Sequence, residues 1–428
     1  MIDQSLLLRG ARVYDAVGSK ASELVVDAVI VSYTYDNLNR QTNGSETRQR
    51  WHSAFTQHYN LNADGTRKMA TETQMQPDGS TITRTTTWTY DADGRLTGES
   101  VTSGDSSEDY TDMFEFDLVG NRMKKAHTGP GGGASETITY EYNGDNQLTT
   151  QTSSLNGETD FTYDDNGSQL TSTNGSIVTS YTYDVRNKMV AVTTASGTTT
   201  YVYNDAGERV QEASDGVTTF YLTDEHNPTG YSQPLEEWTS TAGTLATASL
   251  ARTYFLGDHV YGQADGSGTV SFLLTDGHGS SRLLTDVTGT ITEAYAYDAY
   301  GTATTFDASA AGTEYLFGGD ALYDAISGLY LHGNGIRYRN GFYFLQADSQ
   351  GYGNRNDPFS LHQYLYVGAN PVTNIDPSGH FSIISVAVTA GISGLLSGIM
   401  SVGVHAALNV YHGQPIGQGL WDSFFRRS

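Results

Sequence analysis

Three consecutive stretches in the middle of the chain decide its fold: FTYDDNGSQL at residues 161–170, YTYDVRNKMV at 181–190 and YVYNDAGERV at 201–210. Each begins with two aromatic residues one position apart and continues with Asp or Asn, a short turn, and a Leu, Met or Val. Since side chains alternate between the two faces of a strand, both aromatic rings fall on one face. Asp or Asn before a stretch that contains Gly or Asn is typical of a tight hairpin turn. Each stretch therefore predicts a β-hairpin with an aromatic face.

The pattern recurs toward the N-terminus, as YTYDNLNR at residues 33–40, WTYDADGRL at 88–96, FEFDLVGNRM at 114–123 and YEYNGDNQL at 140–148. The second aromatic stands at positions 90, 116, 142, 163, 183 and 203, in steps of 26, 26, 21, 20 and 20 residues. A period of this kind indicates a repeat array. One hairpin cannot bury its aromatic face alone, whereas neighbours placed edge to edge bury a continuous layer. We therefore predict an all-β array of tyrosine-aspartate (YD) hairpins, and this number of repeats is expected to give a curved sheet with open edges.

Composition excludes several classes of site. Lys and Arg total 23 against 48 Asp and Glu, a formal charge of −25, which argues against nucleic acid as a partner. The chain has no Cys, which rules out disulfides, thiolate metal sites and a Cys nucleophile. The His residues show no metal-ligand spacing, so we predict no metal and no cofactor. The three-Leu run near the N-terminus is too short for the apolar core of a cleavable signal peptide.

The sequence changes character along its length and predicts five segments. A partial repeat occupies residues 1–30, the YD repeats 31–212 and degenerate repeats 213–326. A stretch dense in aromatic residues follows at 327–380, and an apolar tail at 381–428.

Four further motifs connect the chain to a known family. They are FLLTDGHGSSRLLTD at residues 272–286, YAYDAYGT at 295–302, SGLYLHGNGIRYRNGFYFLQAD at 327–348 and DPFSLHQYLYVGANPVTNIDPSGH at 357–380. With the YD repeats, they resemble the RHS family and its RHS repeat-associated core, over roughly residues 30–380. The resemblance implies a β-sheet that spirals into a shell, a partial cocoon here, around a variable C-terminal polypeptide. In this polymorphic-toxin family that polypeptide is commonly a toxin used in bacterial competition or in insecticidal complexes.

The resemblance also implies partners and a location. Expected partners are the chain's own C-terminal segment as enclosed cargo and, in addition, a secretion-system component or an immunity protein. Secreted or cell-surface proteins are the expected class. Related repeats occur in adhesion proteins, so a cell-surface module that binds carbohydrate is the alternative. Exposed Tyr and Trp side chains would favour adhesion, whereas aromatic residues that face inward would favour encapsulation.

Many members of the family cut their own chain after a DPxG motif, using aspartates as an aspartic-protease-like pair. By resemblance, these are Asp348 and Asp376, with the cut next to Gly379 and His380. Two carboxylates held close together share a proton and can activate a water molecule. This chain departs from the family pattern at Ser349 and Tyr343, where Pro and Arg are usual, and at His380, where an aromatic or aliphatic residue is usual. The alternative is that both aspartates only cap turns. Self-cleavage is the most enzymatic activity that we expect of this chain.

Two other constellations have simpler explanations. Asp276, His278 and Ser280 supply the residue types of a catalytic triad, but a triad is defined by spatial geometry rather than by neighbouring positions. We expect a turn between two strands there, with Arg282 pairing carboxylates inside the shell. The sequence DADG at residues 91–94 resembles the start of a calcium loop, yet Thr102 stands where a bidentate Glu is needed. A hairpin turn explains it better.

The tail allows two interpretations. Residues 381–411, FSIISVAVTAGISGLLSGIMSVGVHAALNVY, carry no charged side chain and are long enough to cross a bilayer as a helix. Gly394 and Gly398 form a GxxxG pair suited to close helix contact. This favours a helical tail and a membrane-inserting effector. The other interpretation is a hydrophobic linker that precedes a truncated toxin, because the tail contains no nuclease, protease or transferase constellation.

Overall fold

The structure is a computed structural model, which describes residues 12–14, 20–25, 29–36, 40–48, 53–133, 135–224, 231–257, 259–319, 321–348, 361–380 and 383–384. Within these residues the only helices are short 3-10 turns: η2 (Ser106–Glu108), η3 (Pro130–Gly132), η4 (Leu245–Thr247), η5 (Ala308–Ala310) and η8 (Val367–Ala369). No described helix is long and apolar enough to span a bilayer. The predicted all-β fold is confirmed. Most of the tail, including the GxxxG pair, lies outside the described residues.

One antiparallel sheet of 25 strands forms the wall of the described structure, and each strand pairs with its neighbours in sequence. The strands are β1 (Arg12–Tyr14), β2 (Lys20–Val25), β3 (Val29–Tyr35), β4 (Gln41–Arg48), β5 (Ser53–Leu61), β6 (Arg67–Met75), β7 (Thr81–Tyr90), β8 (Leu96–Ser103), β9 (Tyr110–Phe116), β10 (Arg122–Thr128), β11 (Ser135–Tyr142), β12 (Leu148–Ser153), β13 (Gly157–Tyr163), β14 (Gln169–Asn174), β15 (Ile177–Tyr183), β16 (Met189–Thr194), β17 (Gly197–Tyr203), β18 (Arg209–Ser214), β19 (Val217–Asp224), β20 (Gln233–Ser240), β21 (Ser249–Leu256), β22 (Val260–Asp265), β23 (Val270–Thr275), β24 (Ser281–Asp286) and β25 (Ile291–Ala294).

The aspartate of each repeat fixes its hairpin turn. In the turn between β13 and β14, Asp164 Oδ1 accepts hydrogen bonds from the backbone N–H groups of Asn166 (3.0 Å) and Ser168 (2.8 Å). Gly167 completes the turn at φ +83°, a conformation that costs a glycine little. Asp91 does the same for Asp93 and Arg95, both at 3.0 Å. The hairpin turn expected at residues 91–94 is therefore confirmed.

The second aromatic of a repeat ties its hairpin to the preceding one. Its hydroxyl donates to the carbonyl of the first residue after the previous turn in four pairs: Tyr90 to Arg67 (2.7 Å), Tyr142 to Arg122 (2.9 Å), Tyr183 to Gln169 (3.0 Å) and Tyr203 to Met189 (2.7 Å). The ring covers the inner face of the sheet, while the hydroxyl donates a hydrogen bond to a main-chain oxygen. This arrangement explains why the position is so often tyrosine.

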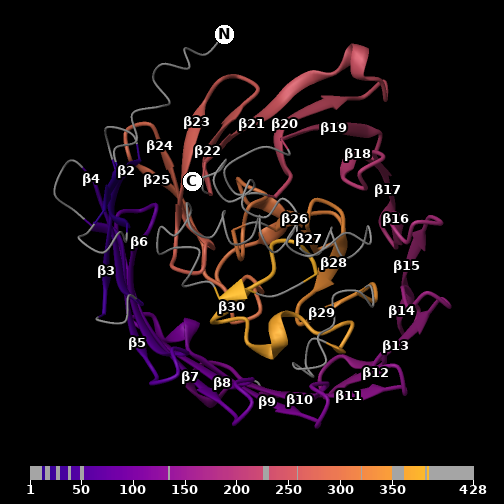
Figure 1. Cartoon of the computed structure of the whole chain (residues 1–428), viewed down its shortest axis with the longest axis horizontal. Coiled ribbons are helices and arrows are strands. Elements are labelled where there is room, and N and C mark those ends of the chain that lie inside the picture. The colour runs from indigo at the N-terminus through magenta and orange to yellow at the C-terminus, as the bar shows by residue number, and fades with distance from the viewer. Residues whose placement is uncertain are drawn as a thin grey trace, which may run out of the picture.

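The wall curls into a nearly closed ring (Figure 1), and strands near its two ends pack against each other. Ala54 and Phe55 of β5 share a buried apolar cluster with Phe272, Leu274 and Leu283 of β23 and β24. Gln74 of β6 donates to the carbonyls of Arg282 (2.7 Å) and Tyr295 (3.2 Å). The first and last parts of the sheet therefore lie face to face.

The chain's own C-terminal part fills the ring. A four-stranded sheet lies inside the wall in Figure 1 and consists of β26 (Leu322–Asp324), β27 (Leu329–His332), β28 (Arg337–Asn340) and β29 (Tyr343–Phe344). Strand β30 (Asn374–Ile375) lies there too, and it pairs with β31 (Ile383–Ile384). Wall rings such as Tyr201 and Tyr254 are buried in one cluster with Tyr315 and Tyr338 of this inner part. We call residues 295–380 the core. The five-segment division predicted from sequence stays a prediction.

Candidate functional site

The core brings the two predicted aspartates to one peptide bond. Asp348 follows β29, where its backbone N–H donates to Gln363 O at 3.0 Å. Asp376 follows β30, is only 4% exposed, and precedes the turn that contains Gly379 and His380. The two carboxylates come from segments that are separated in sequence. They meet because β28, β29 and β30 all belong to the interior of the ring.

Asp376 holds the nitrogen side of the Gly379–His380 peptide. Its Oδ1 accepts from the His380 backbone N–H at 3.1 Å and from Ser378 Oγ at 3.0 Å. Asp164 makes the same contact to the residue four positions on, so Asp376 also caps a turn. The capping contact places a carboxylate at the nitrogen that would leave if this peptide were cut. The contact that caps the turn is thus the same contact that a proton transfer to this nitrogen would use.

Arg337 joins both carboxylates to the carbonyl side of the same peptide. Its Nη2 lies 3.0 Å from Asp348 Oδ2 and 3.6 Å from Asp376 Oδ2, and its Nε donates to Gly379 O. The guanidinium lies 3.7 Å from the centre of the Phe344 ring, which fixes its plane. Sequence reasoning did not single out Arg337. It stands in the RYRN stretch of a quoted motif, where two arginines before the predicted aspartate were the available signal.

Tyr343, which replaces the arginine usual in the family, lies elsewhere. Its hydroxyl donates to Gln169 Oε1 of wall strand β14 at 3.1 Å. It therefore docks the core against the wall.

Burial tunes the acid–base properties of the site. It raises the pKa of Asp376 to about 6, although Arg337 opposes the shift. Burial also lowers the pKa of Arg337, and the charges of Asp348 and Asp376 oppose that shift. A carboxyl group with a pKa near 6 can hold a proton at mildly acidic pH and release it near neutrality. General acid–base catalysis uses groups of this kind.

His380 completes the cluster. Its Nδ1 lies 2.7 Å from Asp348 Oδ1, so the side chain and backbone of one residue contact the two different carboxylates. His332 also contacts this turn, with its Nδ1 2.7 Å from Asp376 O. The structure thus brings Asp348, Asp376, Gly379 and His380 together, and their role in self-cleavage stays a prediction.

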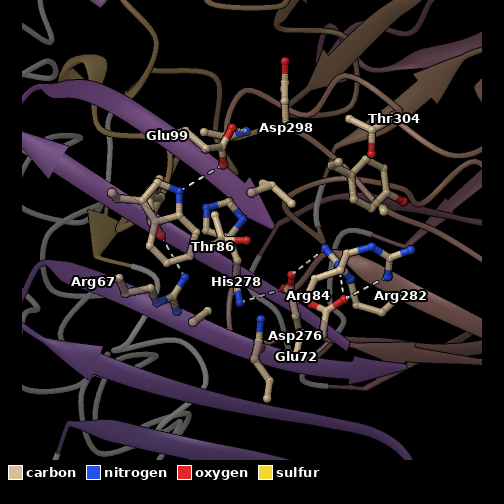
Figure 2. Close-up of a pocket in the computed structure, with 18 of the residues that line it drawn as sticks. Arg67, Glu72, Arg84, Thr86, Glu99, Asp276, His278, Arg282, Asp298 and Thr304 are labelled. Carbon is tan, nitrogen blue, oxygen red and sulfur yellow. Dashed lines mark hydrogen bonds and ion pairs between the residues drawn. The ribbon is translucent and has the colours of Figure 1, made fainter. Parts of the chain in front are cut away.

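A second polar site lies between the wall and the core, in a cavity of about 80 Å³ (Figure 2). Glu72, Arg84 and Arg282 point toward one another at one end of the cavity, and Glu99 lies at the other. Arg282 pairs with Glu72 and lies 3.7 Å from Asp276 Oδ2, which confirms the expectation that it pairs carboxylates inside the shell. A cavity of this size and polarity suits several water molecules.

The residues that resemble a triad do not form one. Asp276 Oδ1 accepts from the backbone N–H groups of His278 (2.8 Å) and Ser280 (3.0 Å), which makes it a turn cap between β23 and β24. The His278 ring contacts Ser280 Oγ at 3.4 Å and Asn374 O at 3.1 Å. Burial lowers the pKa of His278 to about 4, which keeps it neutral. The predicted turn is confirmed. Within the described residues, no group of His, Asp and Glu is arranged to hold a metal ion.

Comparison with known proteins agrees with the fold. A family model described as RHS Repeat matches residues 163–199, from the last residue of β13 to the beginning of β17. The chain carries RHS repeats. None of the curated proteins gives a significant match to it.

Solved structures share the shell fold of this RHS-repeat protein. A crystal structure of TcdB2-TccC3-Cdc42 matches with a TM-score of 0.65 and 19% identity over 90% of this chain and 20% of that chain. TcdB2-TccC3 matches with a TM-score of 0.64 and 19% identity over 86% and 20%. TcdB2-TccC3 without its hypervariable C-terminal region matches with a TM-score of 0.63 and 18% identity over 86% and 19%. The RHS-repeat protein spans about a fifth of the length of these chains.

Proposed function

We propose that this RHS-repeat protein is a shell segment that presents a C-terminal segment and releases it by cutting its own chain at the Gly379–His380 peptide. One observation carries the proposal: the peptide is held on both sides, with Arg337 Nε at the Gly379 oxygen and Asp376 Oδ1 at the His380 nitrogen. Cleavage of a peptide needs stabilisation of charge on the oxygen and a proton for the leaving nitrogen. Arg337 and Asp376 lie next to the atoms where these two needs arise, which supports the proposal.

The reaction would be hydrolysis. Asp348 takes a proton from a water molecule, whose oxygen adds to the Gly379 carbonyl carbon. The negative charge that develops on the carbonyl oxygen faces the Arg337 guanidinium. Asp376, in its protonated form, gives its proton to the His380 nitrogen as the C–N bond breaks. The immediate products are a carboxylic acid at Gly379 and an amine at His380, and the acid then passes its proton to the amine to give carboxylate and ammonium. Asp348 is left protonated and Asp376 ionised.

The filled interior supports presentation of the C-terminal segment rather than its enclosure within this ring. Core and wall share buried clusters around Tyr201, Tyr338 and Phe344, so the core occupies the space that cargo would take. TccC3 occurs with TcdB2 in the solved structures. We extend that relation to this chain as membership of a larger shell, with secretion or cell-surface display as its setting. A secretion-system component, an immunity protein and membrane contact through residues 381–411 remain part of the proposal.

No specific observation favours the adhesion alternative. The exposed large hydrophobic side chains of the described residues are Met, Leu, Val and Ile, and none is Tyr, Trp or Phe. Repeat aromatics such as Tyr140, Phe161, Tyr181 and Tyr201 are instead buried in the cluster that the wall shares with the core, which supports a shell role.

The test is the intact mass of the purified chain, wild type beside Asp348→Asn and Asp376→Asn. We expect a break between Gly379 and His380 in the wild type and none in either variant. Asp164→Asn is the matched control, because Asp164 caps a wall turn in the same way, and it should leave the cut unchanged. A wild-type chain that stays uncut during prolonged incubation from pH 5 to 7 would show that both aspartates only cap turns.

A further inference from the structure

His380 contributes a side chain to the site as well as the nitrogen of the peptide. Its ring Nδ1 lies 2.7 Å from Asp348 Oδ1, while its backbone N–H donates to Asp376 Oδ1. An ionised carboxylate only accepts hydrogen bonds, so an ionised Asp348 requires the proton to be on Nδ1 of the ring. The ring is largely shielded from water, with 20% of the side chain exposed. The contact therefore lies in a setting where hydrogen bonds to a charged group are strong.

This contact acts on the group that would activate water. Asp348 Oδ2 is held by Arg337 Nη2 at 3.0 Å, and Oδ1 by the His380 ring. A water molecule approaching Gly379 must compete with the ring for Oδ1. This competition opposes the attack.

We propose that the His380 side chain restrains the self-cleavage by engaging Asp348. The inference rests on the proposed function, and it assigns a regulatory role to a side chain that the hydrolysis itself does not use. The backbone contact between His380 and Asp376 does not depend on the side chain. Replacing the ring therefore removes the restraint and leaves the leaving nitrogen in place.

Three variants separate the restraint from the chemistry. His380→Leu removes the donor to Asp348 and puts an apolar side chain of similar bulk in its place. His380→Asn keeps an amide N–H that can donate to Asp348. His58→Leu is the control, because His58 lies exposed on β5, far from the core in sequence. Full-length chains are made by cell-free translation, synthesis is stopped, and the cleaved fraction is followed by intact mass. Circular dichroism and melting of the uncut fraction check that each variant folds.

We expect His380→Leu to cut about tenfold faster or more than the wild type, because it loses a hydrogen bond to a charged group. His380→Asn and His58→Leu should cut at the wild-type rate, and adding Asp348→Asn to His380→Leu should abolish the cut. If the wild type cuts and folded His380→Leu is no faster, the restraint is refuted and the proposed function stands. If the double variant still cuts quickly, His380 does not act through Asp348. If no chain cuts, folded His380→Leu included, the proposed function itself fails.

Discussion

Arg209 of wall strand β18 and Asp324 of core strand β26 form an ion pair in the interior, with Nη1 3.2 Å from Oδ2 and side chains only 2% and 1% exposed. Tyr201 adds a hydrogen bond of 2.7 Å to the same carboxylate oxygen. Wall and core are thus joined by a charge pair that water does not reach. Such pairs contribute little net stability compared with apolar contacts, but losing one partner is costly.

Asp324→Ala should therefore destabilise the protein by about 1–3 kcal/mol, because Arg209 and Tyr201 lose a buried acceptor while Glu212 still pairs with Arg209 at 3.0 Å. The free energy of unfolding from denaturant titration measures the effect. Asp165→Ala, at an exposed wall turn, is the control and should change stability by less than about 0.5 kcal/mol. Equal effects for both variants would show that the core is not anchored through Asp324.

The tyrosine hydroxyls that link successive hairpins should each contribute modestly. Tyr183→Phe keeps the ring and removes the donor to Gln169 O, so we expect a loss of about 1 kcal/mol. Tyr323→Phe, at a partly exposed core position, is the control and should be near neutral. A Tyr183→Phe protein as stable as the wild type would mean that burial of the ring, and not the hydrogen bond of the hydroxyl, accounts for tyrosine at this position.

Glu99 should make stability depend on pH. Burial, reinforced by the nearby charge of Asp298, raises its pKa from the ordinary 4.5 to about 7, against hydrogen bonds from Ala299 N and Trp88. A carboxyl whose folded pKa is raised contributes its full stability below the unfolded pKa and loses it as pH rises through the folded pKa. Wild type should therefore lose stability relative to Glu99→Gln between pH 5 and 8. Unfolding titrations at four pH values measure the gap.

Two controls accompany that experiment. Glu158→Gln, at an exposed position, should show no pH-dependent gap from wild type. His278, whose pKa burial lowers, changes stability in the opposite sense as pH falls, so the comparison between variants is the informative quantity rather than the wild-type curve. A gap between wild type and Glu99→Gln that does not vary with pH would contradict the raised pKa.

The proposed cut should be faster in mild acid. Asp376 must carry a proton to serve the His380 nitrogen, and its pKa is raised to about 6. The protonated fraction falls as pH rises through 6, so the initial rate should fall about tenfold per unit well above that value. Cleavage time courses at fixed ionic strength from pH 5 to 8 provide the measurement. A rate that rises steadily to pH 8 would exclude Asp376 as the proton donor.

The wall could be predicted from sequence because its information is local. Aromatic-x-aromatic-Asp sets the face and the turn within one hairpin, and Asp164 and Asp91 act as the pattern predicts. The role of Arg282 could be inferred from a lone cation in an apolar, strand-forming stretch. Asp348 and Asp376 were found by resemblance, since nothing in their spacing shows that they meet.

The filled interior and the role of Arg337 could not be predicted in this way. Closure of the ring depends on curvature accumulated over many strands, and its outcome is a contact such as Gln74 to Arg282. Arg337 acts through three groups that lie apart in sequence, and only the folded core brings them to one guanidinium. Tyr343 shows the limit of the family pattern, because the substituted position docks the wall while a different arginine serves the site.

Pairing of every wall strand with its sequence neighbours has a consequence for how the molecule is made. Each hairpin can form on the one before it as the chain leaves the ribosome, since no wall strand waits for a distant partner. The core is translated after the wall, and its side chains are the ones that join opposite parts of the ring. We therefore expect the ribosome-bound wall to be a sheet whose curvature varies. Its circumference is set only when residues 295–380 have been synthesised and pack against it.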